Sequence, residues 1–268
     1  MSEADVRLAA EAIEARRGAR HLLLLLDFDG TLCEFDPDPQ RVQLPRERQV
    51  LLDRIAEEAT VALVSGRPLA DVRSRCGLQA PAWYAGLHGL EITGPGEDFA
   101  HPGVAHAASL MHALSAAIAA DLRSLHGTFV EDKGLSLAVH FRAASHEDGL
   151  RAADAMLRHA RPHVSAGTIR TMPGDCMVEV LPNIEWDKGS AVEWIRGRVA
   201  TAHPEVWPLY IGDDLTDEDG FRAVKGVGLS VAASPRAAGA DFAVDGPAEV
   251  EALLRQVEAA LRAGSVPP

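Results

Sequence analysis

The residues most able to do chemistry in this sequence are carboxylates that follow directly after apolar runs. Asp27 and Asp29 follow five leucines in the stretch LLLLLDFDGTL, and a second acidic group, Asp213 to Asp217, follows the apolar stretch WPLYIG. A third apolar run, TVALV, leads into Ser65-Gly66-Arg67. Carboxylates held close together repel one another unless a cation lies between them, and several hard oxygen ligands favour Mg²⁺. The sequence therefore predicts a magnesium site, provided that the fold brings these segments together.

A less specific interpretation treats Asp27 and Asp29 as turn or helix-capping residues and the second acidic group as a solvated loop. Either group alone fits that interpretation as well as it fits a metal site. Both groups follow a buried strand, however, and Lys188 lies between them in the sequence, at the predicted start of a helix. This combination favours one acidic site with a basic partner over two unrelated loops.

The segments that carry these groups alternate between buried strands and amphipathic helices. Continuous apolar runs of this length are typical of parallel strands covered on both faces, and we expect such strands at 22–26, 60–68, 82–92, 207–214 and 226–232. Helices are predicted at 4–17, 46–59, 69–76, 188–200 and 217–224. The pattern indicates a doubly wound, Rossmann-like α/β core, in which ligands bind at the carboxyl ends of the parallel strands.

Between the two parts of this core, the pattern changes to an α+β module. Apolar residues repeat every four positions from Leu110 to Leu122, and TFVEDKGLSLAVHFR predicts a hairpin that turns at Asp132-Lys133-Gly134. A second helix is marked by Leu150, Ala153, Leu157 and Ala160, and two more strands follow around a turn at Pro173-Gly174-Asp175. We therefore predict a core of residues 1–94 and 183–268 and an inserted domain of residues 95–182.

Composition and charge argue against several classes of function. The 268 residues include 26 basic and 39 acidic side chains, and the net charge of −13 disfavours nucleic-acid and anionic membrane partners. The leucine run is far shorter than the roughly 20 residues that a membrane span requires, and acidic residues near the N-terminus argue against a signal peptide. Three widely separated cysteines fit neither a disulfide framework nor a zinc site. We expect a cytoplasmic protein with no membrane partner, frayed after about Gly264.

Four motifs resemble those of the haloacid-dehalogenase superfamily of phosphotransferases. DFDGTL, VSGR, Lys188 and GDDLTDED match these motifs in order and spacing, and the insertion resembles the cap domain of that superfamily. The resemblance implies that Asp27 attacks phosphorus and forms an aspartyl-phosphate, while Asp29 acts as general acid and then as general base. It also implies that Ser65 and Lys188 bind phosphoryl oxygens, although by themselves they would also fit a strand-end cap and a surface charge.

The same resemblance implies further roles in the first and last motifs. Gly30 would let the backbone close around the phosphate, and Thr31 would donate a hydrogen bond to it. Mg²⁺ would be held by the carboxylates of Asp27 and Asp213 and by the carbonyl of Asp29. Asp214 and Asp217 would support these ligands from a second layer.

Longer segments resemble one family of this superfamily, the trehalose-6-phosphate phosphatases. These segments are AGLHGLEI, VEDKGLSLAVHFR, MVEVLPNIEWDKGSAV and YIGDDLTDEDGF. The resemblance implies a sugar phosphate as substrate, hydrolysis of trehalose 6-phosphate, and functional coupling to a trehalose-phosphate synthase that supplies it. The candidate substrate-binding residues are Gly30, Arg67, Gly86, His88, Gly89, Glu131, Lys133, His140, Arg142 and Glu179.

Alternatives remain open at this stage. Strand alternation places Glu131 with Lys133 on one face, and His140 with Arg142 on one face of the next strand, but an exposed sheet with cross-strand ion pairs explains that alternation equally well. A phosphatase of sucrose 6-phosphate or of mannosyl-3-phosphoglycerate would share the same core motifs. A non-catalytic, regulatory sugar-phosphate binder would lack at least one catalytic residue, whereas all of them are present here.

Overall fold

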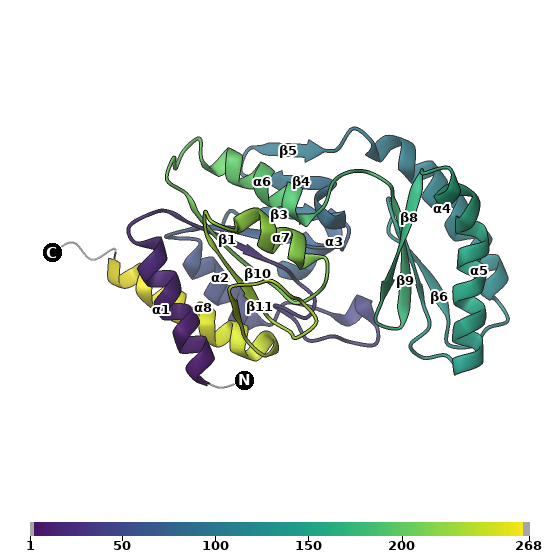
Figure 1. The fold of residues 1–268 in the computed structure, drawn as a ribbon, viewed down its shortest axis with the longest axis horizontal. Coiled ribbons are helices and arrows are strands. Elements are labelled where there is room, and N and C mark those ends of the chain that lie inside the picture. The colour runs from purple at the N-terminus through teal and green to yellow at the C-terminus, as the bar shows by residue number, and fades with distance from the viewer. Residues whose placement is uncertain (1–2, 265–268) are drawn as a thin grey trace. The chain divides into compact units, whose positions relative to one another are not determined.

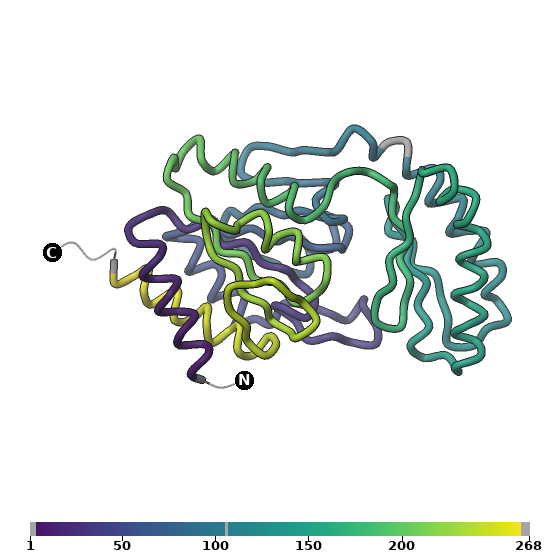
Figure 2. The backbone as a smooth tube through the Cα atoms, in the orientation of Figure 1, coloured from purple at the N-terminus to yellow at the C-terminus, as the bar shows by residue number. Residues whose placement is uncertain are grey.

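A computed structural model describes residues 3–264, apart from the side chains of residues 3, 105, 106 and 264. The predicted fraying after Gly264 therefore lies outside the described residues. The chain divides into two compact units, residues 1–99 with 186–268, and residues 100–185. We call them the core unit and the inserted unit. Figure 2 traces the chain from the core unit into the inserted unit and back.

The core unit is built on an eight-stranded sheet with the order β12-β11-β10-β1-β2-β3-β4-β5. All strand pairs from β12 to β3 are parallel, whereas β4 runs antiparallel to β3. The strands are β1 (Leu22–Leu26), β2 (Thr60–Val64), β3 (Trp83–Gly86), β4 (Glu91–Gly94), β5 (Glu97–Ala100), β10 (Trp207–Gly212), β11 (Leu229–Ala232) and β12 (Phe242–Ala243). From β1 the chain proceeds to β2 on one side, and it later enters β10 on the other. The strand order thus reverses between β1 and β10, the place where open α/β sheets bind ligands.

Helices cover both faces of this sheet, as Figure 1 shows. One face packs against α1 (Glu3–Arg17), α2 (Arg46–Ile55), α3 (Leu69–Cys76) and α8 (Gly246–Gly264), and the other against α6 (Lys188–Val199) and α7 (Asp217–Val224). The leucines of β1 alternate between the two cores and are fully buried, each stabilising the fold by about 1.5–3 kcal/mol. The predicted doubly wound α/β core is confirmed.

The inserted unit is a four-stranded antiparallel sheet covered on one face by two helices. Its strand order is β6-β7-β9-β8, with β6 (Phe129–Asp132), β7 (Leu137–His140), β8 (Ile169–Gly174) and β9 (Met177–Pro182). The helices are α4 (Val104–Leu122) and α5 (His146–Ser165). Leu137, Val139 and Val180 pack against them, so residues of the opposite parity, such as Ala138 and Glu179, lie on the face that these helices do not cover.

Four details differ from the sequence expectation. β5 joins the large sheet, so the units divide at residues 99/100 and 185/186 rather than 94/95 and 182/183. The predicted turn at Pro173 lies two residues later, at Asp175-Cys176; proline is tolerated in β8 because β8 is an edge strand. Leu150 and Leu157 lie on the exposed side of α5. The C-terminal helix α8, which completes one core, had no counterpart in the prediction.

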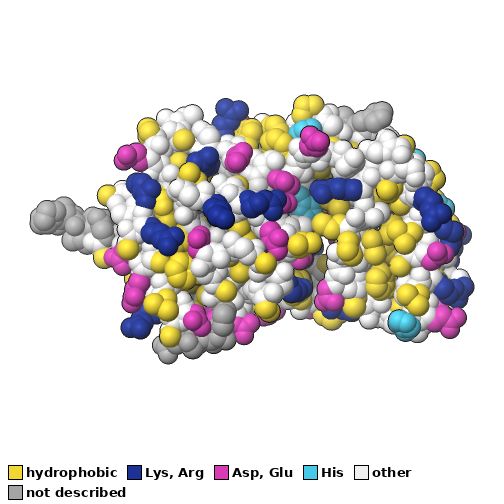
Figure 3. Space-filling view, viewed as in Figure 1, with side chains coloured by type: hydrophobic (Ala, Val, Ile, Leu, Met, Phe, Trp, Pro, Cys, Tyr) yellow, Lys and Arg dark blue, Asp and Glu magenta, His cyan; other side chains and the backbone are white. Residues whose placement is uncertain are grey.

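Basic and acidic side chains are interspersed over the face shown in Figure 3. On this face, basic residues do not gather into one broad area (Figure 3). Across residues 3–264, no helix combines the length and apolar character needed to cross a bilayer.

Candidate active site

Strand β1 places Asp27 at the point where the strand order reverses. Asp27 is only 5% exposed, and its N–H donates to the carbonyl of Ile211 at 2.9 Å, extending the pairing with β10 by one residue. The chain then turns sharply through Gly30, which has φ of +84°. A Cβ at this glycine would lie 2.3 Å from Oδ2 of Asp213. Only glycine therefore allows the turn to pass this close to the loop after β10.

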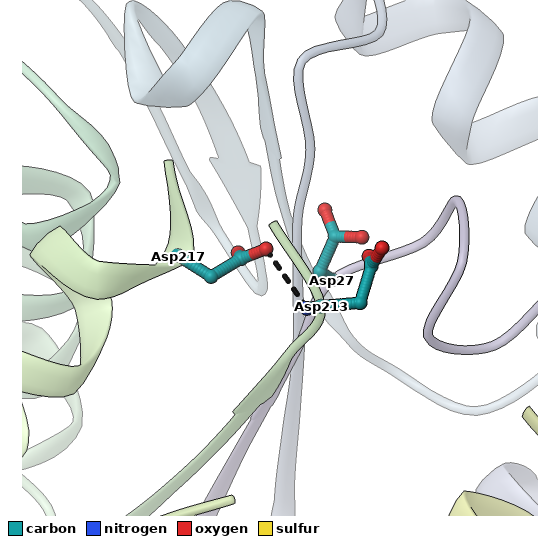
Figure 4. Close-up of side chains that lie close together, drawn as sticks. All are labelled: Asp27, Asp213 and Asp217. Carbon is teal, nitrogen blue, oxygen red and sulfur yellow. Dashed lines mark hydrogen bonds between the residues drawn. The ribbon is translucent and has the colours of Figure 1, made fainter. Parts of the chain in front are cut away.

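Three buried carboxylates meet here, as Figure 4 shows. Oxygens of Asp27, Asp213 and Asp217 all lie within 4.8 Å of one another. Asp213 directly follows β10, and Asp217 is the first residue of α7. The Asp217 carboxylate accepts from the N–H groups of Asp213 and Asp214, at 3.1 and 3.0 Å, and from the hydroxyl of Tyr210 at 2.7 Å. Asp217 thus fixes the loop that presents Asp213.

Lys188 supplies positive charge to this cluster. It is the first residue of α6 and 3% exposed, and its Nζ donates to Asp27 and to Asp217, both at 2.7 Å. Burial alone would lower the pKa of Lys188, but the carboxylates of Asp217 and Asp27 outweigh burial and raise that pKa. Two carboxylates therefore share this one ammonium group. Burial therefore raises the pKa of Asp27 well above its usual value despite Lys188, and the neighbouring carboxylates add to the shift.

Asp213 faces a second cation and a hydroxyl. Its carboxylate accepts from Thr31 Oγ1 at 3.2 Å and from Arg236 Nη2 at 2.6 Å, and the Arg236 guanidinium also lies over the ring of Phe35, at 4.8 Å. Burial, reinforced by Asp217, raises the pKa of Asp213 to about 6. The donor set is entirely hard oxygen and carries excess negative charge, which fits a divalent cation such as Mg²⁺. Within the part of the chain that the structure describes, Asp27, Asp213 and Asp217 form a group of side chains that could hold it.

The carboxylate of Asp29 is held by Arg67. Two guanidinium nitrogens of Arg67 each donate to Asp29 at 2.6 Å, and a third donates to Asp71 at 2.9 Å. Arg75 donates to the same Asp71 at 2.7 Å. Paired donors of this kind fix the carboxylate in both position and orientation. Arg67 thus contacts a candidate catalytic side chain directly.

The loop after β3 lies against the loop after β2. Leu87, His88 and Gly89 all have positive φ, which is rare for three consecutive residues and concentrates at functional sites. The N–H of His88 donates to the carbonyl of Ser65 at 2.9 Å, and a Cβ on Gly66 would lie 3.0 Å from the imidazole ring of His88. Ser65 is 1% exposed, and its Oγ accepts from the N–H of Arg67. The segment Gly86–Gly89 (GxHG) therefore packs directly against the segment Ser65–Arg67 (SGR).

Several site features had no clear sequence signal. Arg236 lies in a loop without a recognisable motif, and Tyr210 looked like an ordinary residue of an apolar strand. Asp71 has the helical i,i+4 spacing to both Arg67 and Arg75, which could have indicated the ion pairs. Asp214, grouped with Asp217 in the sequence expectation, is exposed, and its carboxylate accepts from the N–H of Leu215.

The candidate sugar-binding residues of the inserted unit form two pairs on its sheet. His140 Nε2 lies 2.8 Å from Glu131 Oε2, and Lys133 Nζ donates to Glu179 at 2.9 Å. Glu131 and Glu179 both flank Ala138 in the strand register, so they lie on the face that α4 and α5 leave uncovered. Glu179 is 5% exposed and also accepts from Ser136.

Lys133 and Arg142 lie outside the strands on which alternation had placed them. Lys133 follows the last residue of β6, and Arg142 lies two residues beyond the end of β7. The side chains of a loop do not alternate between two faces as those of a strand do. Strand alternation therefore does not predict where Lys133 and Arg142 lie. Arg142 donates to the carbonyl and the carboxylate of Asp175, at 2.9 and 3.0 Å, in the turn between β8 and β9.

The doubly wound core, the strand-end aspartates and the buried lysine define a phosphotransferase fold of the haloacid-dehalogenase type. The sequence model of the family described as Trehalose-phosphatase matches residues 25–239. A trehalose-phosphate phosphatase of Mycobacterium tuberculosis (strain H37Rv) is 34% identical over 275 residues, covering 98% of this chain and 69% of the relative. The chain therefore belongs to the trehalose-phosphatase family, and it is a phosphatase.

Solved structures share this fold at lower identity. The C-terminal domain of a C. albicans trehalose-6-phosphate phosphatase has a TM-score of 0.78 at 20% identity, covering 95% of this chain and 97% of that domain. The C-terminal domain of a Candida albicans trehalose synthase regulatory protein has a TM-score of 0.66 at 15% identity, with coverages of 91% and 97%. The fold alone therefore does not distinguish a phosphatase from a regulatory protein, and the site residues must do so.

Proposed function

We propose that the chain hydrolyses trehalose 6-phosphate to trehalose and phosphate, with Mg²⁺ as cofactor, through an aspartyl-phosphate on Asp27. The observation that carries this proposal is a buried carboxylate at the end of β1, hydrogen-bonded to a buried lysine and close to two further carboxylates. A protein that only bound sugar phosphates would have no need for this costly arrangement of buried charge. Mycobacterial relatives named trehalose-phosphate phosphatase support the choice of substrate.

In the first step, a carboxylate oxygen of Asp27 bonds to phosphorus while the bond from phosphorus to the sugar oxygen breaks. Asp29 gives its proton to that oxygen, and trehalose leaves as the neutral alcohol. In the second step, Asp29 takes a proton from water, whose oxygen bonds to phosphorus and releases Asp27. The paired hydrogen bonds from Arg67 keep the Asp29 carboxylate in one place between these steps.

Charge on the transferring phosphoryl group needs stabilisation from fixed donors. In our proposal, Lys188, Thr31 and Ser65 donate to its oxygens, and the backbone at Gly30 closes around it. Mg²⁺ would be held by Asp27 and Asp213 and by the carbonyl of Asp29, with Asp217 in support, and it would neutralise part of the phosphoryl charge. Asp214 belongs to this proposal only through its N–H group, which bonds to Asp217.

Recognition of the sugar is assigned to the inserted unit and to the GxHG loop. Glu131, Lys133, His140 and Glu179 lie on or beside one sheet face that no helix of their own unit covers, and hydroxyl-rich ligands are bound by such polar groups. Arg142, His88 and Gly89 complete the proposed set. We keep the proposed division into a core of residues 1–94 and 183–268 and an inserted domain of residues 95–182. In the structure, the two units divide at residues 99/100 and 185/186.

The setting of this reaction is also part of the proposal. A trehalose-phosphate synthase would supply the substrate, so we propose functional coupling to such an enzyme. Cys33, Cys76 and Cys176 are all free thiols, which suits a reducing cytoplasm. We expect no nucleic-acid partner.

A substrate panel tests the proposed activity. Phosphate release is measured from trehalose 6-phosphate, glucose 6-phosphate, sucrose 6-phosphate and mannosyl-3-phosphoglycerate, each with Mg²⁺ and with EDTA. We expect trehalose 6-phosphate to give the highest kcat/KM, and EDTA to abolish turnover. Equal rates on the other sugar phosphates would refute the substrate assignment, and full activity in EDTA would refute the cofactor.

Two variants test the covalent step. Asp27→Asn is expected to abolish turnover, whereas Asp245→Asn, at an exposed aspartate of the same unit, keeps it. Asp29→Asn is tested with an aryl phosphate, whose leaving group needs no acid. This variant should stall after phosphorylation, and intact-protein mass spectrometry should then find one added phosphoryl group. Normal turnover by Asp27→Asn would refute the aspartyl-phosphate.

A further variant tests the sugar-binding face. Glu131→Gln should raise KM for trehalose 6-phosphate, while turnover of the small aryl phosphate should stay unchanged. An equal loss of activity with both substrates would mean that Glu131 acts on the chemistry or on folding instead.

A further inference from the structure

The helical layer of the inserted unit exposes large apolar side chains on its outer surface. Leu150, Leu157 and Val164 of α5 are 60%, 50% and 43% exposed. They recur every seven residues, so they follow one side of the helix. The helix packs on its own sheet with a different side, made of small residues and one methionine: Gly149, Ala152, Ala155, Met156 and Ala160. Leu150 and Leu157 are therefore not part of the buried core of their own unit.

The neighbouring helix α4 widens this apolar surface. Residues 104–120 contain no Asp, Glu, Lys or Arg, although solvent-facing helices normally carry charged residues on their outer side. The exposed side of α4 instead carries Ala113, Ala116, Ala119 and Ala120, together with the polar Ser109 and His112. The two helices lie side by side on the sheet (Figure 1), and Asp121 of α4 bonds to His159 of α5 at 3.0 Å. An exposed apolar stripe such as that of α5 is typical of an interaction site.

The charges around this surface favour a second copy of the chain. The inserted unit holds seven basic and nine acidic residues, a net charge of −2, compared with −13 for the whole chain. Two copies can therefore approach through this unit with little repulsion. Along α5, Asp154 lies three residues before Leu157, and Arg161 lies four residues after it.

This spacing is self-complementary under two-fold symmetry. If two α5 helices run antiparallel with the axis at Leu157, Leu150 of one copy lies beside Val164 of the other, and Asp154 lies within one residue, about 1.5 Å along the helix, of Arg161. Every contact away from the axis then occurs twice, as in isologous interfaces. The 20 residues of α5 extend about 30 Å, which allows the whole stripe to engage. Asp154 also pairs with Arg158 of its own helix, and this exposed pair can persist in the dimer.

We propose that this surface docks a second copy of the chain, forming a two-fold dimer through antiparallel packing of α5 against α5. The interface is formed by Leu150, Asp154, Leu157, Arg161 and Val164, with the alanine face of α4 beside it. None of these residues belongs to the proposed phosphatase site, so phosphate release provides an independent check that each variant folds.

Sedimentation velocity of the full chain, over about a hundredfold range of concentration, tests the proposal because dimerisation follows mass action. We expect the wild-type chain to dimerise and Leu157→Glu to be monomeric, since two carboxylates would then meet at the axis. Leu8→Glu is the matched control: Leu8 is 51% exposed on α1 of the core unit, and this variant should still dimerise. A wild-type chain that stays monomeric, or a Leu157→Glu variant that still dimerises, would overturn the proposal.

Charge reversal tests the register. Asp154→Arg and Arg161→Asp should each raise the dimer dissociation constant by about tenfold or more, because like charges then face each other twice. The double variant should restore dimerisation, and failure to restore it would refute the antiparallel register. A monomeric wild-type chain that cosediments with phosphatidylcholine vesicles would assign the surface to a membrane, which would also overturn the proposed dimer.

Discussion

Replacing Lys188 with methionine removes the ammonium group from the buried acidic cluster and retains an unbranched side chain of similar length. Lys188 is 3% exposed and donates to Asp27 and Asp217, both at 2.7 Å. The variant therefore leaves two buried carboxylates without their shared cation. Removing one partner of a buried ion pair costs about 3–5 kcal/mol, and two charge-assisted hydrogen bonds of about 1.5–3 kcal/mol each give a similar figure. We expect Lys188→Met to lose about 3–5 kcal/mol of unfolding free energy near neutral pH.

The unfolding free energy that Lys188→Met loses should increase with pH. Burial already raises the pKa of Asp27 in the wild-type chain, and removing Lys188 removes a charge that opposes this shift. A carboxyl whose folded pKa exceeds its unfolded value of 3.8 stabilises the fold when protonated, and this stability is lost as pH rises through the folded pKa. The deficit of Lys188→Met should therefore be largest in alkaline solution and smaller in mildly acidic solution.

Urea unfolding in EDTA measures this deficit without interference from metal ions. The four tryptophans, Trp83, Trp186, Trp194 and Trp207, all lie in the core unit, so their fluorescence reports the unit that contains Lys188. Lys225→Met is the control at an exposed lysine of the same unit and should change the unfolding free energy by less than about 0.5 kcal/mol. A deficit below about 1 kcal/mol, or one that is equal in acid and alkaline solution, would refute the assignment of Lys188 as a buried charge partner.

Three further predictions follow from local geometry and charge. Because the pKa of Asp213 is raised to about 6, protons compete with a metal ion there, and Mg²⁺ should raise the melting temperature more at about pH 8 than at about pH 5; equal increases would contradict a site at Asp213. Burial, with the stacked ring of His203, lowers the pKa of His21 below 6.5, so the unfolded chain binds a proton more readily than the folded chain. The unfolding free energy should therefore fall as pH drops below 6.5, and His21→Gln should lessen this fall in urea titrations at several pH values. Gly30→Ala should cost about 1–3 kcal/mol more than Gly239→Ala, because both glycines have φ near +85° but only Gly30 faces a carboxylate, at 2.3 Å; equal costs in urea unfolding would show that the backbone angle alone matters.

The sequence predicted the core well because its signals are local. A continuous run of five leucines indicates a strand buried on both faces, and the structure places each leucine in one of two cores. The helical pattern of α6 and the acidic start of α7 were equally clear, and both helices begin at the expected residues, Lys188 and Asp217.

The inserted unit was harder to predict because its apolar pattern is divided between two surfaces. In α5, the largest apolar residues, Leu150 and Leu157, are exposed, while Gly149, Ala152 and Ala155 face the sheet. Small residues allow the helix to approach the sheet closely, but they give a weak hydrophobic signal in sequence. Hydrophobic spacing therefore identified the helix without identifying its buried side.

The sequence by itself determined which strand ends carry chemistry, because Asp27 and Asp29 are joined covalently to β1 and the carboxyl ends of parallel strands share one edge of the sheet. Only the tertiary structure decided which charges share a partner. Lys188 is 161 residues from Asp27, and Arg67 is 38 residues from Asp29, so both ion pairs depend on strand order and on side-chain direction. In the folded chain, Asp27 accepts a hydrogen bond from Lys188 and lies close to two other carboxylates, whereas Asp29, two residues away, accepts hydrogen bonds from Arg67. Ion pairing acts over a few ångströms in space, whatever the separation along the chain, and only the folded chain fixes those distances.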